Sequence, residues 1–323
     1  MNRIAITGAN GFVGKALINK LSESHQLSIL AISRKPYDIS NHNSDINSLV
    51  IPDFSEATQF EKCLVGVDVV VHAAARVHVM NDAVEEPLTE FRNVNCRNTL
   101  TLAAAAAKNG VKRFVFISSV KVNGEISALG HPLTEEDIVG PVEPYGISKY
   151  EAEQELFKLA SATGMEVVVI RPPLVYGPGV KANFKSMMTW LNNGMPLPLG
   201  AIHNKRSLVG LENLVDFIVT CLTHPAATNQ VFLVSDGEDL STTDLLKRMA
   251  SALGRPARLI PVPEVVLSLF AMLMGKKDFS QRLCSSLQID ISKAKTLLGW
   301  IPPASVNDGL KKTAAAFLES ENR

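Results

Sequence analysis

The fold is decided by residues 4–14, which read Ile4-Ala5-Ile6-Thr7-Gly8-Ala9-Asn10-Gly11-Phe12-Val13-Gly14. An apolar strand runs directly into three glycines and then into the start of a helix. We expect Gly8 to make the tight turn, Gly11 to let the backbone approach a pyrophosphate, and Gly14 to let the helix pack closely on the strand. The pyrophosphate would then lie at the helix N-terminus. The loop residues predicted to contact a dinucleotide are Gly8, Asn10, Gly11, Phe12, Val13 and Gly14.

Beyond this loop, short apolar runs alternate with helical patterns as far as Arg171. We predict strands at residues 4–7, 27–33, 48–52, 67–72, 113–118 and 166–171, and helices at 12–21, 57–64, 93–109 and 145–163. Near-continuous apolar strands separated by helices are typical of a parallel sheet that is covered on both faces. The predicted fold class is therefore α/β, with a doubly wound parallel sheet of the Rossmann type.

After Arg171 the pattern becomes irregular and richer in proline and glycine, which indicates a second, smaller α/β domain. Ser241 followed by Asp244 is typical of a capped helix start, and a strand at 231–234 is expected to return to the large sheet. We assign residues 1–171 plus about 205–236 to the dinucleotide-binding domain. Residues 172–204 plus 237–323 are assigned to the domain that binds the second ligand.

Composition excludes several classes of function. The formal net charge of the 323 residues is zero and no run of Lys or Arg occurs, which argues against a nucleic-acid partner. The four cysteines are scattered and the histidines show no ligand spacing, so we expect a reducing compartment and no metal site. The start of the chain does not resemble a signal peptide, and we expect a cytoplasmic protein. The longest apolar stretch, Val265–Met274, is too short to span a membrane and is predicted to be a packed helix or a subunit contact.

The end of the second strand, Ile32-Ser33-Arg34-Lys35, distinguishes between the two nicotinamide cofactors. An NAD site usually offers an acid to the ribose 2′-hydroxyl, whereas an NADP site offers Arg to the 2′-phosphate. No acid occurs here before Asp38, and Ser33, Arg34 and Lys35 suit a phosphate dianion. NADP(H) is therefore favoured. NAD(H) remains the alternative, because exposed Arg and Lys are also ordinary surface residues.

The chain resembles the extended short-chain dehydrogenase/reductases, which are the nucleotide-sugar epimerases, dehydratases and 4-ketoreductases of the NAD-dependent epimerase/dehydratase family. The resemblance covers nearly the whole length. Besides the glycine loop, the motifs that carry it are Asp53-Phe54, His72-Ala73-Ala74-Ala75, Asn95, Ser118-Ser119, Tyr145-Gly146-Ile147-Ser148-Lys149, Arg171-Pro172-Pro173, Tyr176-Gly177-Pro178 and Leu298-Gly299-Trp300.

The resemblance implies that Ser119, Tyr145 and Lys149 are catalytic. Tyr145 and Lys149 are four residues apart, which places both side chains on one helix face. A nearby ammonium group should lower the pKa of the phenol, so that Tyr145 can move a proton near neutral pH. Ser119 would hydrogen-bond to the reacting oxygen.

By the same resemblance, Asp53 receives the adenine amino group, Lys149 binds the nicotinamide ribose, and the segment Pro172–Tyr176 lines the nicotinamide. The other positions implied to bind cofactor are Phe54, His72, Ala73, Ala74, Ala75, Asn95, Ser118, Tyr145, Pro172 and Val175. The positions implied to bind the nucleotide sugar are Ser119, Lys121, Asn183, Arg206 and Arg282. Arg206 lies where family members clamp the diphosphate, since an Arg fork matches phosphate geometry; a surface salt bridge is its plain alternative.

Departures from the family pattern narrow the chemistry. The 4,6-dehydratases carry an acidic pair directly after the catalytic hydroxyl residue, whereas this chain has Val120-Lys121. Asn123 also replaces the family's usual tyrosine. Residues 118–125 resemble the bacterial UDP-N-acetylquinovosamine-type 4-ketoreductases and related UDP-hexose 4-epimerases.

Three functions remain in view. The first is NADPH-dependent reduction of the C4 ketone of a UDP-4-keto-6-deoxy-N-acetylhexosamine, in the synthesis of O-antigen or capsule sugars. The second is a UDP-hexose 4-epimerase, acting on UDP-glucose or UDP-N-acetylglucosamine with a tightly bound NAD. The third is a non-catalytic dinucleotide-sensing protein, which the intact Ser119, Tyr145 and Lys149 disfavour. The family resemblance also implies a homodimer.

Overall fold

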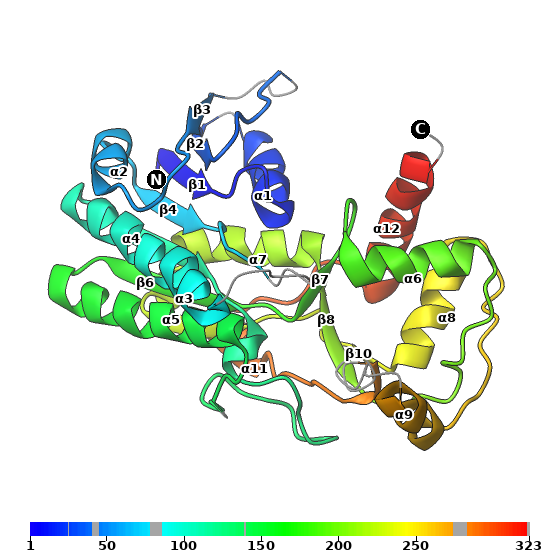
Figure 1. The fold of residues 1–323 in the computed structure, drawn as a ribbon. Coiled ribbons are helices and arrows are strands. Elements are labelled where there is room, and N and C mark those ends of the chain that lie inside the picture. Colours follow the sequence, from blue (N-terminus) through cyan, green and yellow to red (C-terminus); the bar gives the residue numbers. More distant parts are fainter. Residues whose placement is uncertain (25, 41–44, 78–85, 139, 274–282, 322–323) are drawn as a thin grey trace.

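The computed structural model describes residues 1–323 except 25, 41–44, 78–85, 139, 274–282 and 322–323. Within the described part, seven strands form a parallel sheet in the order β3-β2-β1-β4-β5-β6-β9 (Figure 1). These strands are β1 (Arg3–Thr7), β2 (Ser28–Ser33), β3 (Ile46–Val50), β4 (Val69–His72), β5 (Arg113–Ile117), β6 (Glu166–Arg171) and β9 (Gln230–Leu233). The predicted doubly wound sheet is confirmed, including the return of a strand near residue 231 to its edge.

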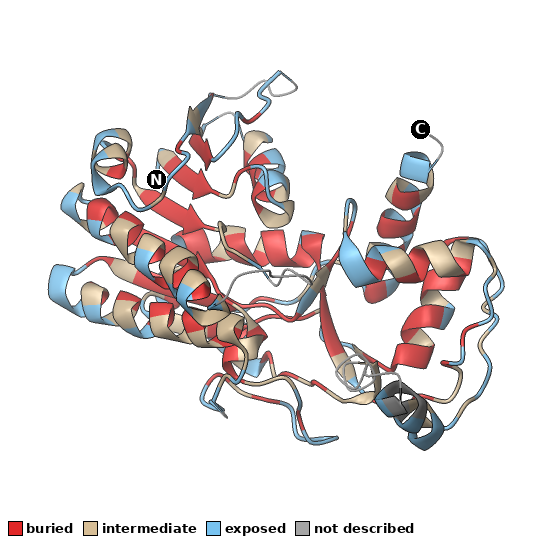
Figure 2. Cartoon of the chain, in the orientation of Figure 1, coloured by how far each residue is buried: buried red, intermediate tan, exposed pale blue. Residues whose placement is uncertain are grey.

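Helices cover both faces of the sheet. One face carries α1 (Phe12–Ser22) and α7 (Leu211–Thr223), and the other carries α2 (Ala57–Cys63), α4 (Asn98–Lys108) and α5 (Pro144–Thr163). The central strands β1, β2, β4, β5 and β6 are mostly buried, whereas the edge strand β3 and the outer helix faces are largely exposed (Figure 2).

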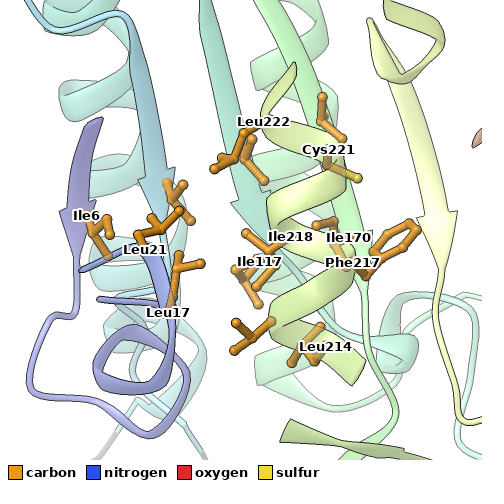
Figure 3. Packing of buried hydrophobic residues seen from close by; sticks show 14 of the residues in the cluster. Ile6, Leu17, Leu21, Ile117, Ile170, Leu214, Phe217, Ile218, Cys221 and Leu222 are labelled. Carbon is orange, nitrogen blue, oxygen red and sulfur yellow. The ribbon is translucent and has the colours of Figure 1, made fainter. Parts of the chain in front are cut away.

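Side chains alternate between the two faces along each strand. Ile6 of β1 contributes to the cluster that contains α1 and α7, whereas its neighbour Ala5 contributes to the cluster on the opposite face. Figure 3 shows Leu214, Phe217 and Ile218 of α7 among the side chains of the first cluster. Burial of each such side chain contributes about 1.5–3 kcal/mol, so the sheet is a firm base for residues at its carboxyl edge.

The segment before β5 differs from its prediction. The helix expected at 93–109 begins earlier, as α3 (Pro87–Arg92), and passes through the π-helical turn η1 (Asn93–Arg97) into α4. Pro87 occupies the first turn of α3, where a missing N–H is harmless. Two short 3-10 helices, η2 (Val120–Val122) and η3 (Pro225–Ala227), follow later.

The second part of the molecule is built on a small sheet of β10 (Asp239–Leu240), β8 (Arg206–Gly210) and β7 (Leu174–Tyr176). β8 is antiparallel to β10 and parallel to β7. The α-helices described after β7, apart from α7, are α6 (Ala182–Asn192), α8 (Thr242–Ala252), α9 (Glu264–Leu273), α11 (Ser292–Leu298) and α12 (Val306–Glu321). As expected, Ser241 caps α8, because its hydroxyl accepts the N–H of Asp244 at 2.9 Å.

The chain crosses between the two parts more than once. β8, which we assigned to the dinucleotide-binding domain, pairs with β7 and β10 in the small sheet. Ala294, Leu298 and Trp300, which we assigned to the second domain, pack in the cluster beneath the large sheet. The domain boundaries therefore remain a prediction. Both β8 and the residues of the Ala294–Trp300 segment make contacts across the boundary that we assigned.

The apolar stretch near residue 265 forms α9, and several of its described side chains are exposed. Val265 is 80% exposed, and Val266, Leu269 and Met272 are each more than half exposed. Leu267 of the same helix is partly buried and packs against the apolar cluster of the second part. A subunit contact at this helix remains a prediction. None of the described helices is both long and apolar enough to cross a membrane.

Candidate active site

The glycine loop between β1 and α1 has the geometry that its sequence requires. Gly8 has a φ of +70°, and a Cβ there would lie 2.8 Å from the backbone nitrogen of Ala74. A Cβ at Gly14 would lie 2.2 Å from the carbonyl oxygen of Gly8, so α1 packs on the loop only without a side chain. The result is bare backbone beside the N-terminus of α1, where N–H groups lack intrahelical partners. A pyrophosphate fits this place.

The polar residues at the end of β2 have two different roles. The buried Ser33 hydroxyl donates to the carbonyl oxygen of Lys35 and accepts from the Asn10 amide at 3.1 Å. Asn10 also donates to the carbonyl oxygens of Lys35 at 2.9 Å and Pro36 at 3.2 Å. Asn10 and Ser33 therefore hold the loop in shape. Arg34 and Lys35 are exposed cations at the same edge.

His72 at the end of β4 is held by two threonines. Its ring nitrogens lie 2.6 Å from the Thr7 hydroxyl and 2.9 Å from the Thr99 hydroxyl. Burial, followed by the charge of Lys149, lowers the pKa of His72 to about 3. The ring is therefore neutral at pH 7, and its two hydrogen bonds hold the end of β4 to β1 and to α4.

The loop after β4, which contains Ala73, Ala74 and Ala75, is fixed by Asn95. The Asn95 amide accepts the N–H of Arg76 at 2.8 Å and donates to the carbonyl oxygen of Arg76 at 3.0 Å. Asn95 is fully buried and also donates to Ser148 on α5 at 3.1 Å. Its contribution here is to hold backbone in place.

Asp53 and Phe54 follow β3. The exposed Asp53 carboxylate accepts the N–H of Ser55 at 2.8 Å, and this hydrogen bond lowers the pKa of Asp53. The side chain is thus charged and open to a donor such as an amino group. Phe54 packs edge-to-face on Phe60, with ring centroids 5.1 Å apart.

Ser119, Tyr145 and Lys149 come together at the carboxyl end of β5. Ser119 accepts the N–H of Lys121 at 3.2 Å, and its hydroxyl is close enough to the Tyr145 phenol to influence the pKa of that phenol. The first turn of α5 lies directly on this loop, because a Cβ at Gly146 would be 2.9 Å from the carbonyl oxygen of Lys121. Glycine at position 146 thereby lets Tyr145 reach Ser119.

The expected effect of Lys149 on Tyr145 is not what the structure shows, and we correct it. Burial raises the pKa of Tyr145 to about 12, with the Ser119 hydrogen bond acting in the opposite direction. The Lys149 ammonium donates to the carbonyl oxygen of Ile117 at 2.8 Å. Burial lowers the pKa of Lys149 to about 7, opposed by the charge of Glu153. Burial thus dominates both groups, and Lys149 is bonded to the strand.

The sequence patterns do not predict a buried ion pair that lies behind Ser119. Arg171, the last residue of β6, lies 2.6 Å from the Glu153 carboxylate of α5, and the two side chains are 2% and 1% exposed. The neighbouring Ser118 hydroxyl also donates to Glu153. The signal that could have found it is the spacing of Glu153, four residues after Lys149.

The residues expected to line the nicotinamide follow directly after this pair. Pro172 is buried, and its carbonyl oxygen accepts the N–H of Val120 at 3.0 Å. Val175 is half-buried in β7, where it pairs with Val209. The start of the second domain is thereby tied to the loop that contains Ser119.

The residues predicted to bind the nucleotide sugar lie on different elements. Lys121 is beside Ser119 and forms ion pairs with Glu125 at 2.9 Å and with Glu143. Asn183 is exposed in the first turn of α6. Arg206 begins β8 and donates to the carbonyl oxygen of Ser285 at 3.0 Å. Arg282 lies outside the described residues.

The fold and this site define the chain as an extended short-chain dehydrogenase/reductase. The family model described as "NAD dependent epimerase/dehydratase family" matches residues 4–235, and the chain belongs to that family. It is therefore an NAD(P)-dependent nucleotide-sugar enzyme.

Two relatives and one solved structure illustrate the similarity. A UDP-glucose 4-epimerase of Vibrio cholerae is 49% identical over 99% of this chain and 97% of its own. A UDP-glucose 4-epimerase of Mycolicibacterium smegmatis is 28% identical over 98% of both chains. The crystal structure of UDP-glucose 4-epimerase from Thermotoga maritima with UDP-glucose is 25% identical over 99% of each chain, with a TM-score of 0.75.

Proposed function

We propose that the protein is a 4-epimerase of UDP-hexoses, with UDP-glucose as the first substrate to test. The observation that carries the proposal is that Ser119, Tyr145 and Lys149 lie together at the carboxyl end of β5. The high similarity to a UDP-glucose 4-epimerase supports the choice of reaction over the 4-ketoreductase that the sequence favoured first.

In this proposal Tyr145 moves the proton at the C4 oxygen of the sugar, and Ser119 hydrogen-bonds to the same oxygen. A nicotinamide dinucleotide, when bound, supplies the exchange of hydride at C4. Gly8, Gly14 and the N-terminus of α1 would hold its pyrophosphate, and Asp53 would accept from its adenine amino group. Because the pKa of Tyr145 is about 12 in the free protein, the phenol is a proton donor until bound ligands change its surroundings.

The sugar nucleotide would lie between Lys121 and the second domain. Arg206 would contact the diphosphate, because a guanidinium matches phosphate geometry. Its present bond to the carbonyl oxygen of Ser285 holds the side chain at the start of β8. Lys121 would contact the sugar from the loop that also presents Ser119.

A 4-ketoreductase that uses NADPH is the second candidate. The exposed Arg34 and Lys35 favour it, because they stand at the end of β2 with no acid before Asp38. A preference for NADP(H) is part of this second candidate. A homodimer is proposed for either candidate.

The experiment that separates the candidates is incubation of the purified protein with UDP-glucose, UDP-N-acetylglucosamine and a UDP-4-keto-6-deoxy-N-acetylhexosamine. Interconversion of C4 epimers without added cofactor supports the epimerase. Stoichiometric consumption of NADPH with the keto sugar, and no epimerisation, would replace it by the reductase.

A further inference from the structure

Glu153 is buried at the centre of the polar contacts behind Ser119. Its carboxylate accepts from Nε of Arg171 at 3.1 and 3.2 Å and from Nη2 at 2.6 Å. The Ser118 hydroxyl donates to the same carboxylate. Because Ser118 follows β5 and Arg171 ends β6, one side chain of α5 connects the carboxyl ends of two neighbouring strands.

Lys149 lies one helical turn before Glu153 and contacts the same strand. Its ammonium donates to the carbonyl oxygen of Ile117 at 2.8 Å and lies 4.3 Å from the ring centroid of Phe116. Ile117 and Ser118 are the two residues before Ser119. The helix is therefore bonded to both of them, and these bonds fix where the Ser119 hydroxyl lies relative to Tyr145.

The groups that face Lys149 come from several elements. Glu153 is on α5, His72 is on β4, and the Phe116 ring is on β5. His72 is neutral at pH 7, because its pKa is about 3. Burial works against the charge on Lys149, whereas the negative charge of Glu153 favours it.

Arg171, the last residue of β6, has partners besides Glu153. Its Nη1 donates to the Asn123 side chain at 3.2 Å and to the carbonyl oxygen of Glu135 at 3.0 Å. The Glu135 carboxylate is occupied elsewhere, since it accepts the N–H of Leu233 at 2.9 Å. Glu153 is thus the acid bonded to Arg171 and acting on Lys149, while Glu135 is a buried acid of the same neighbourhood with a different partner.

We propose that Glu153 is a positioning residue of this active site, whose carboxylate fixes the strand ends around Ser119 and, one helical turn from Lys149, supplies a negative charge that favours the protonated form of that amine. The proposal rests on the proposed function in one respect, the assignment of Tyr145 and Lys149 as catalytic. A neutral group at position 153 would leave the Arg171 cation without its counter-ion near Lys149. Lys149 would then lose its proton at lower pH.

The test compares Glu153→Gln, Glu153→Asp and the matched control Glu135→Gln in the whole protein. For each, the pH profile of kcat/KM is recorded for the interconversion of UDP-glucose and UDP-galactose, because kcat/KM reports the free enzyme. We expect the alkaline limb of Glu153→Gln to move to lower pH by about one unit, as for loss of an opposite charge near an ionisable group. Glu153→Asp keeps the charge and should keep the limb of the wild type, with a lower kcat. Glu135→Gln should also keep it.

A second readout does not depend on activity. The difference in unfolding free energy between each protein and its Lys149→Met derivative is measured from pH 5 to pH 10, which reports the proton on Lys149 directly. The proposal would be overturned if Glu153→Gln moved neither the alkaline limb of kcat/KM nor the pH at which the stability difference reports loss of the Lys149 proton. If the wild type interconverts no UDP-sugar, the proposed function fails, and the stability readout still decides the role of Glu153. If Glu153→Gln does not fold, Glu153→Asp decides. Because this variant keeps the charge, an alkaline limb of kcat/KM that moved to lower pH by about one unit would contradict a role for the charge.

Discussion

The ammonium nitrogen of Lys149 lies 2.8 Å from the carbonyl oxygen of Ile117, in the buried space between α5 and β5. An amine in this position costs stability when it is charged, because burial removes its water shell. That cost is present at neutral pH, where burial has brought the pKa of Lys149 to about 7. A residue that only packed would not be selected to destabilise the fold in this way. The unfavourable burial of Lys149 therefore indicates a functional role.

We therefore predict that Lys149→Met raises the free energy of unfolding by roughly 1–3 kcal/mol at pH 7 while removing activity. Between a folded pKa of about 7 and the ordinary lysine value of 10.5, the unfolded wild type binds one more proton than the folded form. Wild-type stability should then rise with pH in this window, and the advantage of the variant should shrink. Urea unfolding at several pH values measures it; an advantage that does not change from pH 7 to pH 10 would show that Lys149 is not the cause.

Tyr145→Phe should lower kcat by about 10²–10⁴, because the variant keeps the ring but lacks the hydroxyl that carries the proton. Cofactor binding should stay close to that of the wild type, as should the edge-to-face contact with Phe91 at 6.1 Å. Steady-state kinetics and a cofactor titration check the two halves. A variant that keeps more than about a tenth of the wild-type kcat would remove Tyr145 from the role of proton carrier.

Gly146→Ala should damage the site more than the helix. The new Cβ would lie 2.9 Å from the carbonyl oxygen of Lys121, so the first turn of α5 must move away from the Ser119 loop. Overpacking of this kind costs about 1–3 kcal/mol and shifts Tyr145. Kinetics and thermal unfolding are compared with Ser161→Ala, an exposed position of the same helix that should stay near the wild type. Unchanged kcat in Gly146→Ala would mean that the close approach is unimportant.

Arg34→Ala tests the choice of cofactor. The side chain is exposed at the end of β2, where a 2′-phosphate would lie, so its loss should weaken NADPH and barely change NADH. Loss of one charge-assisted contact, about 1.5–3 kcal/mol, corresponds to a change in affinity of roughly ten- to hundred-fold. Fluorescence titration of both reduced cofactors gives the answer. If the wild type binds NADH at least as tightly as NADPH, this edge holds no phosphate site and the epimerase proposal gains support.

Local sequence patterns predicted the large sheet well, because most of its strands are apolar runs bounded by turn residues. They placed β6 at Glu166–Arg171 and put Gly8 and Gly14 where only glycine fits. The direction of Lys149 could not be predicted, because it depends on a carbonyl group of β5 that is distant in sequence. The exposure of α9 was equally hidden, since an apolar run does not reveal which of its sides the rest of the fold covers.

The central claim, that the site exchanges hydride with C4 of a UDP-hexose and returns it, is tested most directly with UDP-glucose that carries deuterium at C4. The purified protein is incubated with this substrate without added cofactor, and the product is followed by NMR and mass spectrometry. The account predicts UDP-galactose that keeps the deuterium at C4, because the same hydride is returned to the other face. Recovery of unchanged UDP-glucose, from a protein that converts a UDP-4-keto sugar when NADPH is supplied, would contradict it.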